Sequence, residues 1–357
     1  MKKRYNVIGL MSGTSLDGLD IAYCTFTSED GQWKYAIQAA ETIPYPPDLS
    51  NRLSTIENSS ARELARLDAD YGHYLGQRVR DFMAKYRKRP DFIASHGHTI
   101  FHQPEKGMTL QIGKGSAIAA ETGLMVVNDF RAADVARGGQ GAPLVPIGDR
   151  LLFHEYDFCL NLGGFANVSY EKEDIRIAFD VCPANIVLNA LSQKKGKEFD
   201  CDGELATAGH LNVPLLDKLD ALPFYVQKPP KSLGKEWVLE NIHPLLEQSG
   251  CSVEDKLNTF CVHIAKQIGH SFPGCDGKSL LVSGGGACNT YLISMIRAYT
   301  RANVVVPDTL TIHFKEALIF AFLGVLRIRN EVNTLASVTG AQTDHSGGSV
   351  WAGNSGL

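Results

Sequence analysis

The sequence predicts an α/β protein built from two related halves. Strand-like and helix-like patterns alternate along its 357 residues. A strand, a glycine-rich turn and a second strand occur twice, at 7–24 and at 158–171. A further apolar run ends in the triple-glycine turn SGGGACN at 283–289. Since about 150 residues form a typical domain, the length indicates about two domains.

In the first half, the pattern predicts strands at 5–10 and 19–26, a strand-like continuation to the prolines at 44–47, and a long amphipathic helix from Ser59 to Lys88, because its apolar residues recur at spacings of three and four. The runs PDFIASHG, SAIAAETG and LMVVNDF then predict a buried strand, a helix with a glycine stop and another strand.

The loop ARGGQGAPLVP at 136–146 is the best candidate for a hinge, so we expect an N-terminal lobe at 1–135 and a C-terminal lobe at 136–357. The second half predicts a strand pair at 156–171, a strand ending at Asp180 and a helix that has Pro183 near its first turn. Helices from 213 to 270, the strand and helix around SGGGACN, a strand at 304–308, a second-lobe core helix from Phe314 and a poorly ordered or surface-tied tail complete the prediction.

Composition and charge exclude several classes of function. A hydrophobic content of 44%, a charged content of 21% and a net charge of −4 are typical of an ordinary soluble globular protein and argue against a nucleic-acid surface. The eight cysteines are scattered and contain no C-x-x-C pair, which favours free thiols in a reducing compartment. No run was expected to reach the roughly 20 apolar residues of a membrane span. We therefore expect a cytoplasmic protein that binds neither nucleic acid nor membrane.

The opening turn, MSGTSLDG at 11–18, is the first candidate site. Glycines, hydroxyls and backbone N–H groups in such a turn can surround a phosphate. Asp17 and Asp20 would repel a naked phosphate, but they suit a Mg²⁺ ion held through water beside a nucleotide. The alternative is a tight hairpin stabilised by Asx and Ser/Thr turns.

Together, the three glycine turns favour an ATP site between two lobes, with one turn for each end of the phosphate chain and one for the adenosine. Neither a P-loop nor a G-x-G-x-x-G fingerprint is present, which leaves an NAD-dependent Rossmann enzyme a distant possibility. The candidate ATP-binding residues are Gly13, Thr14, Ser15, Leu16, Asp17, Gly18, Leu19, Asp20, Asn161, Gly163, Gly164, Asn167, Gly284, Gly285 and Gly286.

Several motifs, in order along nearly the whole chain, resemble those of the anhydro-N-acetylmuramic acid kinase family. They are GLMSGTSLDGLDIA, SHGHTIFHQP, TLQIGKGSAIAAETG, NDFRAADVARGGQGAPLVP, NLGGFANVS, FDCDGELATAGH, PPKSLGKEW, VSGGGACN and EALIFAFLG. The resemblance implies a two-lobed ATPase of the actin, hexokinase and Hsp70 type, with ribonuclease H-like duplicated lobes and the active site in the cleft between them. It also implies a homodimer.

The resemblance further implies a coupled reaction that uses ATP and Mg²⁺. The 1,6-anhydro ring of anhydro-N-acetylmuramic acid is hydrolysed while O6 is phosphorylated, which yields N-acetylmuramic acid 6-phosphate for cell-wall recycling. Asp180 matches the base that activates the water. From the residues alone, Asp180 lies at a strand end before a helix, where the helix dipole would keep it ionised. Without the resemblance, a helix cap is the favoured interpretation, because acids at such positions are common caps.

Two departures from the family pattern concern the sugar site. In the usual family pattern a threonine and two glycines follow the base. Here these positions hold Val181, Cys182 and Ala184, which removes a hydroxyl and adds side-chain volume. His98 replaces a glutamine and would add a pH dependence. The chain could therefore act on another anhydro- or amino sugar, or be a nucleotide-binding sugar sensor without turnover.

The candidate sugar-binding residues are His96, Gly97, Thr99, Arg131, Asn185 and Glu316. Arg131 could pair with the lactyl carboxylate, or else with Asp129 or Asp134 as a structural ion pair. Glu316 is read from the residues as a helix N-terminal charge and, by the resemblance, as a sugar contact. A zinc site at His96, His98 and His102 is a weaker interpretation than sugar hydrogen bonding. Cys182 is interpreted as packing.

Overall fold

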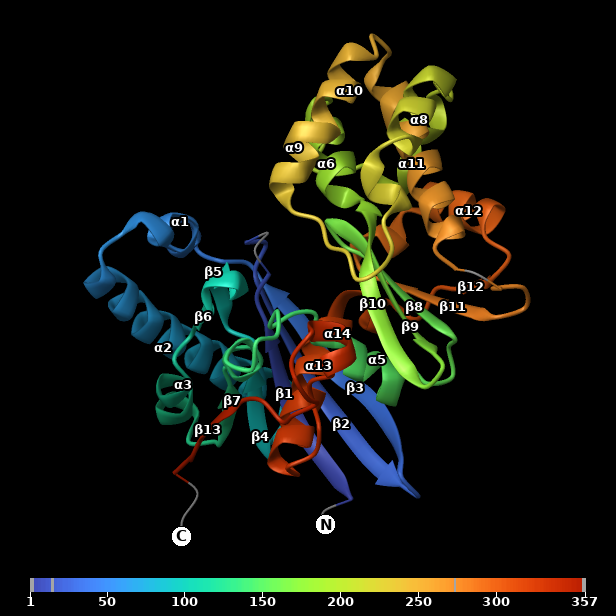
Figure 1. Cartoon of the computed structure of the whole chain (residues 1–357). Coiled ribbons are helices and arrows are strands. Elements are labelled where there is room, and N and C mark those ends of the chain that lie inside the picture. Colours follow the sequence, from blue (N-terminus) through green and yellow to red (C-terminus); the bar gives the residue numbers. More distant parts are fainter. Residues whose placement is uncertain (1–2, 14–15, 273, 355–357) are drawn as a thin grey trace. The chain divides into compact units, whose positions relative to one another are not determined.

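The computed structural model describes residues 3–13, 16–272 and 274–354, which form two compact units. One unit runs to Leu152 and resumes at Phe314, and the other spans Phe153–His313 (Figure 1). This division differs from the predicted boundary at 135/136. The chain after Phe314 returns to the first unit because its long helix and its last strand pack there.

The first unit is built on a sheet with the order β13-β7-β4-β1-β2-β3. Strands β1, β2 and β3 form an antiparallel meander, β4 and β7 run parallel to β1, and β13 pairs antiparallel with β7. The strands of this unit are β1 Arg4–Met11, β2 Leu19–Glu29, β3 Gln32–Ile43, β4 Phe92–Ser95, β5 His98–Gln103, β6 Met108–Ile112, β7 Val126–Asn128 and β13 Ser349–Trp351.

Helix α2, Ala61–Tyr86, confirms the predicted long helix. It begins with a capping box, in which Ser60 and Glu63 satisfy each other's backbone N–H groups, and it ends where Arg87 takes a left-handed conformation. Its apolar face packs with α3 against the sheet (Figure 1). The other helices of the unit are α1 Pro47–Thr55, α3 Gly115–Thr122, α4 Ala132–Val135, α5 Val145–Leu152 and α14 Ala336–Thr339.

Helix α13, Thr309–Ile328, carries two corrections. It is long and apolar enough to cross a membrane by length and composition, contrary to the sequence-based expectation, although 78% of its most apolar window is buried within the structure. From Phe314 it also belongs to the first unit rather than to a second lobe. Gly9 on β1 permits this packing, because a Cβ there would lie 2.0 Å from the carbonyl oxygen of Ala317.

The second unit repeats the strand topology of the first. Its sheet has the order β10-β9-β8-β11-β12, in which β8, β9 and β10 form an antiparallel meander and β11 and β12 run parallel to β8. The order β3-β2-β1-β4-β7 in the first unit is equivalent. The predicted α/β fold with an internal duplication is therefore confirmed.

The strands of the second unit are β8 Phe158–Leu162, β9 Phe165–Lys172, β10 Ile175–Pro183, β11 Ser279–Ser283 and β12 Asn303–Val305. Its helices are α6 Asn185–Gln193, α7 Glu204–Ala208, α8 Val213–Asp220, α9 Lys235–Asn241, α10 His243–Gln248, α11 Val253–His270 and α12 Thr290–Tyr299. All eight cysteines are free, as expected.

The described part of the C-terminal segment is tied to the first unit, which agrees with the surface-tied alternative of the prediction. Helix α14 and strand β13 lie within it, and the indole N–H of Trp351 donates to the side-chain oxygen of Asn128 over 3.0 Å. The pairing of β13 with β7 gives the segment backbone partners that its composition does not reveal.

Candidate active site

The second and third glycine turns lie at the same edge of the second sheet. Asn161 on β8 pairs in register with Ser283 on the parallel strand β11, so the chain leaves both strands side by side. The backbone N–H of Asn185, at the start of α6, donates to the carbonyl of Gly163 over 3.1 Å, and its side-chain amide donates to Leu162 over 3.1 Å. Asn185, predicted to bind sugar, thus holds the glycine turn in place.

The glycines at this edge fall into two classes. Gly284 has a φ of +82°, and a Cβ there would lie 2.5 Å from the side-chain oxygen of Asn161. A Cβ at Gly286 would lie 2.7 Å from that of Leu162, so packing requires both glycines. At Gly164 and Gly285 the nearest atoms to a Cβ lie 3.9 and 4.0 Å away. The fold has room for side chains at these exposed positions, so their bare backbones suit the close approach of a ligand.

We expect Gly285→Ala to fold normally and to weaken nucleotide use. Its melting temperature should stay within about 2 °C of wild type, while KM for ATP rises about tenfold, because only a bound ligand would meet the added methyl group. Thermal melts and steady-state kinetics check both. Gly284→Ala is the contrasting variant and should lower the melting temperature. An unchanged KM in Gly285→Ala would remove this turn from the nucleotide site.

Asp180 lies within β10, opposite Asn167 of β9, and a β-bulge follows it between Asp180 and Cys182. Its backbone N–H donates to the carbonyl of Lys231 over 3.0 Å, and its Oδ2 accepts from the N–H of Leu233 over 2.8 Å. The strand continues to Pro183 and α6 begins only at Asn185, so the helix-cap interpretation is wrong.

The pKa of Asp180 is raised above its usual value by burial, and the hydrogen bond from Leu233 partly opposes this. Burial, rather than the expected helix dipole, therefore has the largest effect on the pKa of this carboxyl. The carboxylate of a group with a raised pKa is a stronger base than that of an ordinary aspartate.

The departures beside Asp180 are absorbed by the core. Val181, Cys182 and Ala184 are all buried. Burial raises the pKa of the Cys182 thiol, with a further contribution from the charge of Asp180. The thiol therefore stays protonated, which agrees with its interpretation as a packing residue.

The segment 227–234 was missed as part of the site. It carries PPKSLG, part of a motif that resembles the family pattern, and nothing in its sequence indicates a contact with Asp180. Its contribution comes from the backbone of Lys231 and Leu233, and the ammonium of Lys231 lies 4.4 Å above the ring of Phe224. The recurrence of the motif was the one signal that could have pointed to it.

In the first unit, Arg131 and His96 form the centre of the candidate sugar site. The Nε and Nη2 of Arg131 lie 3.1 and 2.8 Å from Nε2 of His96, and Nη1 donates to the carbonyl of Gly141 over 2.8 Å. His96 Nδ1 lies 2.9 Å from the Gly97 carbonyl, so Nδ1 carries the proton and Nε2 accepts from Arg131. Burial lowers the pKa of His96 well below its usual value, and the charge of Arg131 adds to this effect.

Arg131 forms an ion pair with neither Asp129 nor Asp134, so the prediction of a structural ion pair with one of these acids is wrong. Within the described residues, its contacts use three of the five guanidinium N–H donors and none is to a carboxylate. Burial lowers its pKa to about 10, against an opposing contribution from Glu316. A buried guanidinium in this state is suited to bind an anionic group of a ligand.

The other predicted sugar residues are placed as follows. Glu316 lies well inside α13 rather than at its start, so the helix N-terminal interpretation is wrong. Burial raises its pKa, and the charge of Arg131 opposes this. Gly97 has a φ of +74° and a Cβ there would lie 2.5 Å from the Ile112 carbonyl, which gives it a packing role. Thr99 lies on β5, where its hydroxyl accepts from Gln111 over 3.4 Å.

In the opening turn, the predicted ATP-binding residues Thr14 and Ser15 lie outside the described residues. Gly13 accepts from the N–H of Leu16, while the side chain of Leu19 is buried in the core. Asp17 is exposed, and Asp20 accepts from the hydroxyl of Thr42 over 2.5 Å. A Cβ at Gly18 would lie 2.5 Å from the Ile43 carbonyl, so packing alone requires this glycine.

His98 supports this turn from beneath. Its Nδ1 lies 2.9 Å from the hydroxyl of Ser12, which also accepts from the hydroxyl of Tyr45 over 2.7 Å. Burial lowers the pKa of His98 to about 4. The imidazole is therefore neutral near pH 7, and the pH dependence expected from this substitution does not fall in the neutral range. The described residues contain no cluster of three metal-binding side chains, which gives no support to the zinc interpretation.

The lowered pKa of His98 predicts an acid sensitivity of folding. The contribution of neutral His98 to the free energy of unfolding is fully present above the pKa of the unfolded state, roughly 6.5. It is lost as pH falls toward about 4. Wild type should lose about 2–3 kcal/mol more free energy of unfolding between pH 7 and pH 4 than His98→Gln, as checked by denaturant titration. His210→Gln, at a side chain that is 95% exposed, is the control. Equal losses in wild type and His98→Gln would contradict the prediction.

Comparisons with known proteins identify the family. The family model described as anhydro-N-acetylmuramic acid kinase matches residues 5–353. The protein of that name from Mannheimia succiniciproducens is 34% identical, over 98% of this chain and 100% of its own length. The one from Pseudomonas putida is 35% identical, over 94% of this chain and 96% of its own length. The chain therefore belongs to the anhydro-N-acetylmuramic acid kinase family and is a sugar kinase.

Proposed function

We propose that this chain hydrolyses the 1,6-anhydro ring of anhydro-N-acetylmuramic acid and phosphorylates its O6 from ATP, in the cytoplasm and as a homodimer. The observation that carries the proposal is the state of Asp180. Its carboxyl is half-buried, one oxygen accepts from a backbone N–H, and burial raises its pKa. These properties suit a general base.

Asp180 is proposed to take a proton from water as the water attacks C1. The C1–O6 bond then breaks, and O6 takes the γ-phosphoryl group from ATP. Since Leu233 holds Oδ2, the orientation of the carboxyl is set before the substrate binds. The products are N-acetylmuramic acid 6-phosphate and ADP.

ATP is proposed to bind at the glycine edge of the second unit. Gly164 and Gly285 expose backbone that packing does not require to be bare, and Asn161, Gly163, Asn167, Gly284 and Gly286 shape the same edge. Mg²⁺ usually binds through one or two carboxylates, water and substrate phosphates, rather than through a protein cage. Asp17 and Asp20 would suffice for that, and the ion would neutralise the phosphate charge.

Arg131 is proposed to bind the lactyl carboxylate of the sugar, with His96 as its orienting partner. Thr99 and Glu316 are proposed to contact sugar hydroxyls. The test of the whole reaction is mass spectrometry of the product formed from Mg·ATP and the anhydro sugar in ¹⁸O-labelled water. One heavy oxygen at C1 of a phosphorylated product supports the proposal. ATP binding without product would favour another sugar or a sensor.

A further inference from the structure

The C-terminal segment 333–348 is fixed on helix α13. The side-chain amide of Asn333, which is 1% exposed, donates to the carbonyls of Leu323 and Gly347, and its oxygen accepts from the N–H of Gly347 over 2.7 Å. Arg327 donates from Nε to the carbonyl of Gly348 over 2.8 Å. These hydrogen bonds therefore hold the segment against helix α13.

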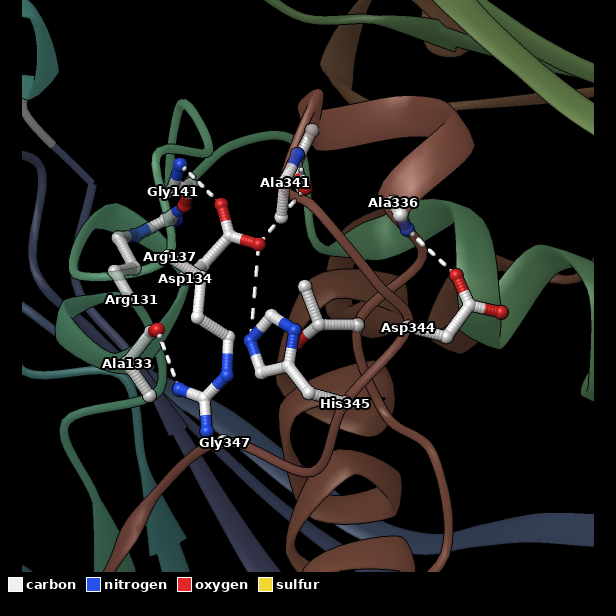
Figure 2. A network of polar contacts seen from close by, with 12 residues as sticks. Arg131, Ala133, Asp134, Arg137, Gly141, Ala336, Ala341, Asp344, His345 and Gly347 are labelled. Atoms are coloured by element: carbon white, nitrogen blue, oxygen red, sulfur yellow. Dashed lines mark hydrogen bonds and ion pairs between the residues drawn. The ribbon is translucent and has the colours of Figure 1, made fainter.

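The segment 333–348 contacts Asp134, whose side chain is fully buried. The hydroxyl of Thr339 donates to Oδ1 over 2.8 Å. Nε2 of His345 lies 3.7 Å from the same oxygen (Figure 2). The backbone N–H of Gln140 donates to the Thr339 carbonyl over 2.8 Å, which ties the glycine-rich loop to the segment a second time.

From Asp134 the contacts continue to Arg131 through a single residue. Oδ2 of Asp134 accepts from the N–H of Gly141 over 2.7 Å, and the carbonyl of Gly141 accepts from Nη1 of Arg131 over 2.8 Å. Gly141 has a φ of +69°, a conformation that glycine adopts without strain. Asp134 is thus committed to the loop and to Thr339 and does not pair with Arg131.

We propose that Thr339 and Asp134 are positioning residues of the sugar site, which set the guanidinium of Arg131 through the peptide of Gly141. The inference rests on the proposed binding of the lactyl carboxylate by Arg131. Removing the Thr339 hydroxyl leaves a buried carboxylate oxygen without that donor, so the loop shifts to satisfy it. Displacement of Arg131 by a fraction of an ångström would weaken a two-pronged contact to a carboxylate.

The test is calorimetric binding of anhydro-N-acetylmuramic acid and of 1,6-anhydro-N-acetylglucosamine, which lacks the lactyl group. Wild type should prefer the first sugar. Thr339→Val should reduce this preference about tenfold with unchanged ATP affinity, and Thr339→Ser should restore it. Thr343→Val makes the same chemical change at an exposed position of the segment and should bind as wild type does. If Thr339→Val does not fold, Thr339→Ala replaces it.

The outcomes separate the inference from the proposed function. A wild-type preference that Thr339→Val leaves intact, or an equal loss of affinity for both sugars, overturns the positioning role alone. A wild-type protein that binds both sugars equally overturns the role of Arg131, and the inference with it. Selective loss of the preference, restored by serine, supports both.

Discussion

Asp180→Asn is expected to lower kcat by about a thousandfold or more while ATP still binds, since a general base contributes roughly 10²–10⁴-fold. The substituted amide keeps an oxygen that can accept the N–H of Leu233, so the segment 227–234 should stay in place. The measurement is ADP release in the presence of the anhydro sugar, together with ATP binding by calorimetry.

The control for this variant is Asp174→Asn, at an exposed position in the turn before β10. It should retain full turnover, because its carboxylate lies in a hairpin turn whose left-handed backbone asparagine also tolerates. Retained turnover in Asp180→Asn would remove this residue from the role of base and would favour a different group for activating the water.

The raised pKa of Asp180 adds a pH signature to the same experiment. The base is active when deprotonated, so the rate should fall on the acidic side through a pKa above the usual 3.8 of an aspartate. Breaking the bond from Leu233 would raise that pKa further, because this bond stabilises the ionised form.

The fold could be predicted from the sequence to the extent that its local patterns repeat. Strand, glycine turn and strand occur once in each half, and the two sheets share one strand order for that reason. The helical period of α13 predicts a buried face but does not say which core covers it. The carbonyl of Ala317 packs so closely on Gly9 that no Cβ fits there. This is a long-range contact that no local pattern contains.

The candidate site could be predicted from its side chains, whereas the backbone groups that contact them could not. Asp180 and Arg131 were chosen by residue type and motif. The partner of Asp180, the N–H of Leu233, lies 53 residues away and has no side-chain signature. The backbone contact of Arg131 was also not predictable. The nearby acid Asp134 suggested an ion pair, whereas its carboxylate accepts hydrogen bonds from the N–H of Gly141 and from the hydroxyl of Thr339.

Arg131→Lys is expected to lower kcat/KM for anhydro-N-acetylmuramic acid about a hundredfold and to change that for a sugar without the lactyl group by less than about threefold. Lysine keeps the positive charge but cannot donate to His96 and Gly141 and still present a planar pair of donors to a carboxylate. The measurement is steady-state kinetics with both sugars at saturating ATP.

Arg137→Lys is the matched control, since Arg137 lies just beyond helix α4 from Arg131 and has an exposed side chain that donates to the carbonyl of Ala133. It should leave both kinetic constants unchanged. A parallel loss on both sugars in Arg131→Lys would show that the arginine supports the fold of the loop and does not recognise the carboxylate. A selective loss would identify the group on the sugar that the guanidinium binds, because the two sugars differ in the lactyl group alone.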